Sequence, residues 1–290
     1  MMTILMMTWK EMMRKRVLSL TFILTVVFLI GFWYVAKIIG NDGNMGVPDP
    51  TQNLIRDFSN GSIILSLGFF FATFVIAFLS IFSSFSVVSG EAEQGVMQAL
   101  LPRPLPRWKW FMGRWLGYTL LGVLYSALLF IALLFITDLY AGIPRELGVW
   151  MKSFLLFAWI VPLLVSVSML GSCYFPAFGN GVFMIMMYGA GWLGGMLEKV
   201  TATGMFKEDS RASLDMVSGL TSLAMPVDTL QRRMLAELFS FKDMQSYLDI
   251  DRMGPFSLQA IPSNTFLVYA ALYTVAALLL GMFTFQRKDL

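Results

Sequence analysis

The sequence contains no histidine, a single cysteine and few charged residues. Only 13% of its 290 residues are Asp, Glu, Lys or Arg, whereas soluble domains carry roughly 25%. Without histidine, serine–histidine and zinc–histidine catalytic sites are excluded, and Cys173 alone cannot form a disulfide within the chain. Apolar residues are abundant instead: 57% are hydrophobic and the mean hydropathy is +0.71. This composition predicts an integral membrane protein.

Several apolar runs reach the roughly 20 residues that a helix needs to cross a bilayer. They do not alternate as barrel strands do, so helices are expected. Residues 153–197 contain no Asp, Glu, Lys or Arg, and Pro176 and Gly179 divide them into two helices. We predict an all-α polytopic protein, with 1–290 forming one transmembrane domain. Its six spans are expected at about 17–39, 61–88, 115–137, 153–172, 181–197 and 263–285.

The distribution of Lys and Arg predicts the orientation of the chain. If the N-terminus is cytoplasmic, ten basic residues lie in cytoplasmic segments and four in the short opposing loops. We therefore expect a multi-pass protein of the cell membrane with both termini in the cytoplasm. The first apolar run is too long for a cleaved signal core and is expected to remain as a span.

Residues 198–262 are then external. Asp228 follows Pro226 and predicts a helix that continues to Leu238. This segment shows no catalytic constellation, and a structural cap is the simpler interpretation.

Residues 1–16 separate into an apolar and a basic face, which predicts a short helix lying in the membrane interface. Trp9, Arg14 and Arg16 would anchor it in lipid, and Trp108 and Trp110 would mark the same interface before the third span. The alternative is an ordinary basic flank that only sets the topology.

The cytoplasmic loop 89–114 is the most informative segment outside the spans. Ser89 can cap a short helix, an acid in its first turn suits the helix dipole, and Pro102 ends it. Such a projecting helix could receive a push from a partner protein. The alternative is a solvated loop that carries topology-setting arginines.

Three classes of function compete at this point. An ion-coupled carrier normally places charged residues or broken helices at mid-membrane, and the predicted span cores hold no Asp, Glu, Lys or Arg. An intramembrane enzyme would need a Ser–Lys pair at the span ends. A transport subunit driven by another chain fits the uncharged spans, and the missing G-x-x-x-x-G-K-[ST] loop means that ATP would be bound elsewhere.

The loop Glu91-x-Glu93-x-Gly95, with Leu100-Leu101-x-x-Pro104-x-x-Arg107 after it, resembles the signature of type-2 ATP-binding-cassette (ABC) permeases. Gly113-Arg114-x-x-Gly117 and the closing Asp289-Leu290 are similar to the same family. The most similar branch holds sodium-efflux, nitrous-oxide-reductase-maturation and bacteriocin-immunity permeases.

The resemblance implies an exporter permease subunit without catalytic activity, cofactor or nucleic-acid partner of its own. It would pair with a second permease protomer, identical or paralogous, in membrane lipid, and dock on two ATPase subunits that bind ATP and Mg. We expect the second and fifth spans to line the protomer interface. A self-contained sodium-coupled carrier and an intramembrane enzyme remain the alternatives. The residues expected to contact the ATPase are Glu91, Glu93, Gly95, Met97, Leu100, Leu101 and Arg107.

Overall fold

The computed structural model describes residues 2–14, 16–41, 50–93, 106–141, 146–202, 208–239 and 262–288. Within these ranges the regular elements are all helices and there is no strand, so the predicted all-α class is confirmed. In chain order the helices are α1 (Met2–Arg14), α2 (Arg16–Asn41), α3 (Pro50–Ser84), α4 (Ser89–Glu93), α6 (Arg107–Asp138), α7 (Leu147–Tyr174), α8 (Ala177–Ala202), α9 (Glu208–Ala224), α10 (Val227–Leu238) and α12 (Asn264–Arg287).

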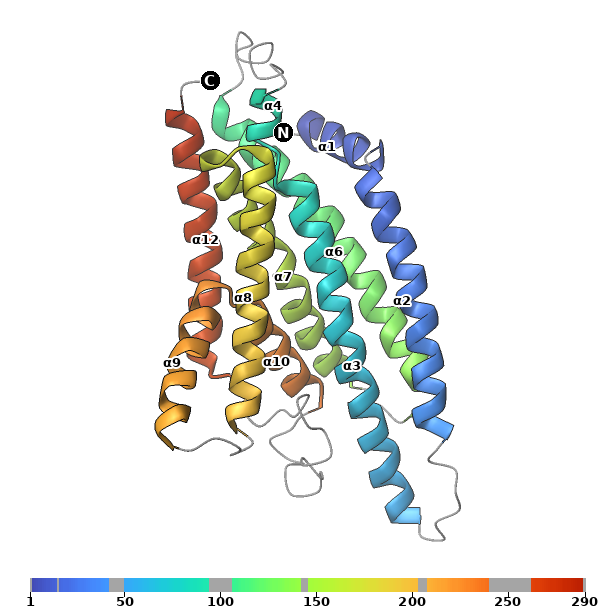
Figure 1. Cartoon of the computed structure of the whole chain (residues 1–290). Coiled ribbons are helices and arrows are strands. Elements are labelled where there is room, and N and C mark those ends of the chain that lie inside the picture. Colours follow the sequence, from blue (N-terminus) through green and yellow to red (C-terminus); the bar gives the residue numbers. More distant parts are fainter. Residues whose placement is uncertain are drawn as a thin grey trace.

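Five helical segments in the described ranges are long and apolar enough to cross a membrane. They are α2, α3 continued through α4, α6, α7 and α12. Helix α8 runs alongside them (Figure 1) and its 26 residues extend about 39 Å at 1.5 Å per residue. It is not among the five. The sixth span therefore stays a prediction.

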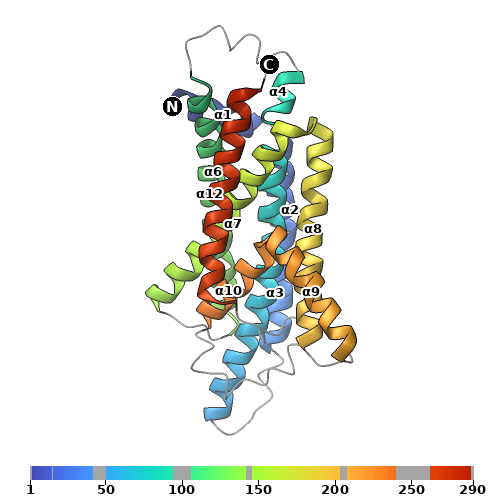
Figure 2. The same ribbon diagram turned by 90° about the vertical axis from the view of Figure 1, so that its left-hand side faces the viewer.

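The helices that flank the bundle gather at its two ends. Helix α1 lies across one end, where α4, the chain termini and the α7–α8 turn are also found (Figures 1 and 2). We call this the α4 end. Helices α9 and α10 lie toward the opposite end, which we call the α10 end. The helix expected from Asp228 to Leu238 is confirmed as α10.

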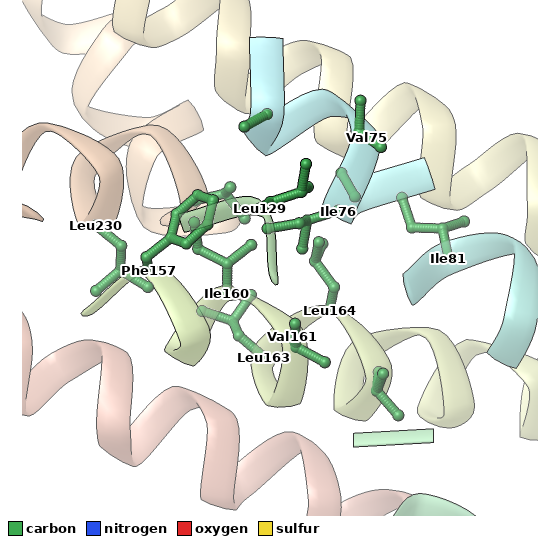
Figure 3. Packing of buried hydrophobic residues seen from close by; sticks show 14 of the residues in the cluster. Val75, Ile76, Ile81, Leu129, Phe157, Ile160, Val161, Leu163, Leu164 and Leu230 are labelled. Carbon is green, nitrogen blue, oxygen red and sulfur yellow. The ribbon is translucent and has the colours of Figure 1, made fainter. Parts of the chain in front are cut away.

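Helices α3 and α7 form the interior of the bundle. In their most apolar stretches 72% and 67% of residues are buried, against 17% for α2 and 22% for α12. Side chains of α3, α6, α7 and α10 meet around Phe157 and Ile160 (Figure 3). Because lipid is as apolar as leucine, close packing rather than the hydrophobic effect holds such helices together.

Two predicted boundaries differ from the structure. Helix α3 begins at Pro50, eleven residues before the expected span, and α6 begins at Arg107 although 107–114 was expected to be loop. Pro106, directly before the helix, has an extended backbone. In the first turn of α6, Trp110 stacks on Phe285 of α12, with ring centroids 5.1 Å apart. A contact between two residues so far apart in the sequence leaves no local sequence signal.

Candidate functional site

Arg114 joins three helices at the α4 end. Its guanidinium group forms ion pairs with Glu11 of α1 and Glu91 of α4, although all three residues lie far apart in the sequence. The same group lies 5.5 Å from the ring centroid of Trp110. The side chains of Arg114 and Glu91 are only 8% and 14% exposed, so their charges compensate each other away from water. Arg114 therefore fixes α1 and α4 to the start of α6.

Small residues on α6 let α1 approach closely. The indole Nε1 of Trp9 donates to the carbonyl oxygen of Gly117 at 3.1 Å. A Cβ atom at Gly117 would lie 2.8 Å from Cβ of Thr8, and one at Gly113 would lie 2.9 Å from a methyl of Ile4. Only glycine permits this approach without displacing α1. Trp9, predicted to be a lipid anchor, thus contacts the protein itself.

Helix α4 is also bound to the α7–α8 turn. The Ser172 hydroxyl oxygen accepts from the backbone N–H groups of Val88 and Ser89 at 3.0 and 3.1 Å, which satisfies donors at the start of α4. A carboxylate oxygen of Glu93 accepts from the backbone N–H of Ala177, the first residue of α8, at 3.1 Å. The short helix is therefore held from both sides.

Asn180 strengthens the same connection. Its Nδ2 atom donates to the carbonyl oxygens of Phe85 at 2.6 Å and Ser168 at 2.9 Å, so the α3–α4 turn, α7 and α8 meet at one side chain.

Arg107, the first residue of α6, is bound to the end of α12. Its guanidinium donates to the carbonyl oxygens of Gln286 and Lys288, at 3.2 and 2.7 Å. The Lys288 ammonium in turn donates to the carbonyl oxygen of Cys173 at 2.8 Å. The basic end of α12 is therefore bound to the start of α6 through Arg107 and to the end of α7 through Lys288.

The predicted site residues separate into three groups. Glu91, Glu93, Arg107 and Trp9 come together at the α4 end, where each bonds to a residue of another element. Trp110 is buried, whereas Trp108 and Arg14 are exposed. Gly95, Met97, Leu100, Leu101 and the side chain of Arg16 lie outside what the structure describes.

Sequence reasoning gave no role to Glu11, Ser172 or Asn180. The Gly113-Arg114-x-x-Gly117 pattern singled out Arg114, but the pairing of Arg114 with Glu11 and Glu91 was not predicted.

The surface beside Glu93 is apolar and aromatic. Tyr174, Phe175 and Phe178, in and beside the α7–α8 turn, are 66%, 41% and 83% exposed. Because Glu93 binds the first residue of α8, this aromatic surface is continuous with α4.

A second cluster of charges lies at the α10 end. Asp228 pairs with Lys199 at 3.3 Å and with Arg232 at 2.9 Å, and Arg232 also pairs with Glu198 at 2.6 Å. Burial alone would lower the pKa of Arg232, but the hydrogen bond that Arg232 donates to Glu198 and the charge of Asp228 raise it instead. Arg232 therefore stays charged, and the cluster binds α10 firmly to α8.

Neither cluster offers catalytic or metal chemistry. Within the described ranges, no group of three or more Cys, Asp or Glu side chains is placed to hold a metal ion. Ion pairs join different helices at both ends: Arg114 with Glu11 and Glu91, and Lys199 and Glu198 with Asp228 and Arg232.

An all-helical bundle with five helices long and apolar enough to cross a membrane in the described ranges defines a multi-pass membrane protein. A family model described as "ABC-2 family transporter protein" matches residues 2–290, so the chain belongs to the ABC-2 family of transporter proteins. It is a membrane permease subunit of an ABC transporter and not itself an enzyme, and such permeases work with an ABC ATPase partner. No curated protein matches the chain.

Proposed function

We propose that this chain is the permease subunit of an ATP-driven exporter, and that its ATPase docks at the α4 end. The observation that carries the proposal is the bond network around α4. Arg114, Ser172 and Glu93 join this short helix to α1, α6, α7 and α8. Export and the sodium-efflux-type branch are the finer assignments that the sequence resemblance implies.

The network is suited to transmitting force. Separating a buried ion pair costs about 3–5 kcal/mol when one partner is left unpaired. A displacement of α4 that kept its neighbours still would have to break the Arg114–Glu91 pair and the bonds to Ser172. It is easier for α4 to carry the attached helices with it, so ATP-driven motion of a docked ATPase would reach the bundle.

The docking surface would combine α4 with the exposed aromatic residues of the α7–α8 turn. Glu91 faces inward to Arg114, so its proposed part is to hold α4 in place. Glu93 and Phe178 are exposed and would face the ATPase. Such apolar rings beside a polar rim are typical of interface anchors.

The orientation of the chain and the pairing of two protomers are proposed from the same arrangement of helices. Both termini lie with α4 at one end (Figure 1) and would be cytoplasmic. For pairing with a second copy or a paralogue, α8 offers more surface than α3. Phe71 is the one exposed side chain among residues 58–84 of α3. Beyond Phe178, the large apolar residues exposed on α8 are Val182, Phe183, Ile185, Met186 and Leu193, and all of them except Phe183 recur along one face.

Co-purification of the native ATPase tests the docking proposal. We expect Glu93→Lys and Phe178→Glu each to reduce the ATPase recovered with the permease in mild detergent by at least fivefold. Met216→Glu is the matched control, because Met216 is 70% exposed on α9 at the other end. Equal recovery with all three variants, at equal membrane insertion, would contradict docking at the α4 end.

A further inference from the structure

A cavity of about 500 Å³ lies at the α10 end, between α8, α9, α10 and the start of α12. Its volume is within the roughly 300–1,000 Å³ range of small-molecule sites. It is remote from the α4 end, so it belongs to neither the proposed docking surface nor the Arg114 network.

The charges that line the cavity cancel. Arg232 is paired with Glu198 at 2.6 Å, and Arg211 lies 3.9 Å from Asp215. An anion or a cation would therefore meet no excess of opposite charge. A zwitterion would have to separate pairs that already exist, so a neutral ligand fits the electrostatics best.

Hydroxyl groups make up much of the remaining lining. Thr201, Ser218, Ser222, Thr229 and Ser263 all contribute. Four polar atoms of lining residues find no hydrogen-bond partner in the described part of the chain: Ser222 Oγ, Thr229 Oγ1, and Nε and Nη1 of Arg232. Of these, Arg232 Nε lies 2.9 Å from Asp228 in an ion pair. Each of these three residues is less than 9% exposed. Buried polar groups are normally hydrogen-bonded, so these atoms call for a ligand that both donates and accepts.

One wall of the cavity is apolar. Leu223 of α9 and Phe266 of α12 face it together with Pro262. A sugar or polyol matches this division, because its hydroxyl groups can bond to Thr229, Ser222 and Arg232 while its C–H face packs on a ring. We propose that this cavity binds a neutral polyhydroxylated ligand of the sugar class, either free or as the headgroup of a lipid.

Maltose is a suitable probe for the first test. The full chain is placed in phosphatidylcholine nanodiscs, without glycoside detergents that carry sugar themselves, and binding is measured by calorimetry. We expect saturable binding that Thr229→Val and Ser222→Ala each weaken at least tenfold. Thr221→Val is the control, since its hydroxyl donates within α9 to Val217 and Ser218 and it does not line the cavity.

Filling the cavity provides a second variant. A Cβ atom at Gly219, which lines the cavity, would meet nothing within 4 Å, and the same is true of Gly148 on α7. Both Gly219→Leu and Gly148→Leu should therefore fold, and we expect only the first to abolish maltose binding.

Two sources of the ligand can be separated with a dihexosyl lipid in the nanodisc. Binding of maltose identifies a free sugar, and protection of α9 from hydrogen exchange only by the lipid identifies a headgroup. The proposal is overturned if neither binds, if the cavity variants bind as the wild type does, or if citrate or betaine binds more tightly than both sugars.

Discussion

Replacing Arg114 by methionine should weaken the bundle more than any other single loss of charge at the α4 end. The substitution keeps a long side chain but removes the guanidinium that pairs with Glu91, whose side chain is only 14% exposed. A net hydrogen bond to a charged group contributes about 1.5–3 kcal/mol. The pair with Glu11 adds less than about 1 kcal/mol, because the Glu11 side chain is 36% exposed and screened by water. We therefore expect the free energy of unfolding to fall by about 3 kcal/mol.

The assay is denaturant unfolding of the purified chain in mixed micelles, followed by tryptophan fluorescence. Lys109→Met is the matched control, because it removes one positive charge from an exposed position on the same helix and should cost under about 1 kcal/mol. A double-mutant cycle with Glu91→Gln should give a coupling energy of at least about 1 kcal/mol. Equal losses for Arg114→Met and Lys109→Met, or additive effects in the cycle, would refute the role given to Arg114.

Three further predictions concern packing and the two clusters. Gly117→Ala should destabilise the chain by about 1–3 kcal/mol through overpacking against α1, whereas Gly31→Ala, where a Cβ meets nothing within 4 Å, should be neutral or stabilising in the same unfolding assay. Ser172→Ala should lower the free energy of unfolding by about 1–3 kcal/mol, because it removes the acceptor of two buried N–H groups. It should also speed hydrogen exchange in 85–93. Ser126→Ala should not have this effect, because the Ser126 hydroxyl bonds within its own helix. Asp228→Asn should lower stability by about 3–5 kcal/mol without changing ATPase recovery, and reduced recovery would show that the two ends are not independent.

Features that depend on neighbouring residues were predictable from the sequence. Apolar runs located the long helices, and Pro176 marked the break between α7 and α8. The proline before Asp228 located α10 in the same way. These signals are local because helix length, caps and breaks are determined within a few residues.

Features that depend on distant contacts were not predictable. The position of Trp110 at the membrane interface stays a prediction, whereas its stacking on Phe285, 175 positions later in the chain, leaves no mark near Trp110. The pairing of Arg114 with Glu11 and Glu91 required α1 to lie on α6, which the pattern of residues 1–16 could not show. Helix α9 was missed because its polar sequence lacks a long apolar run.

Site-specific crosslinking from the α4 end tests the central proposal most directly. Cys173 is 4% exposed and can be replaced by alanine, so a cysteine introduced at position 93 would be the one reactive thiol. In native membranes we expect Glu93→Cys to crosslink to an ABC ATPase subunit, and Met216→Cys at the α10 end to give no such product. An ATPase captured from position 216 instead, or from neither position, would contradict docking at α4.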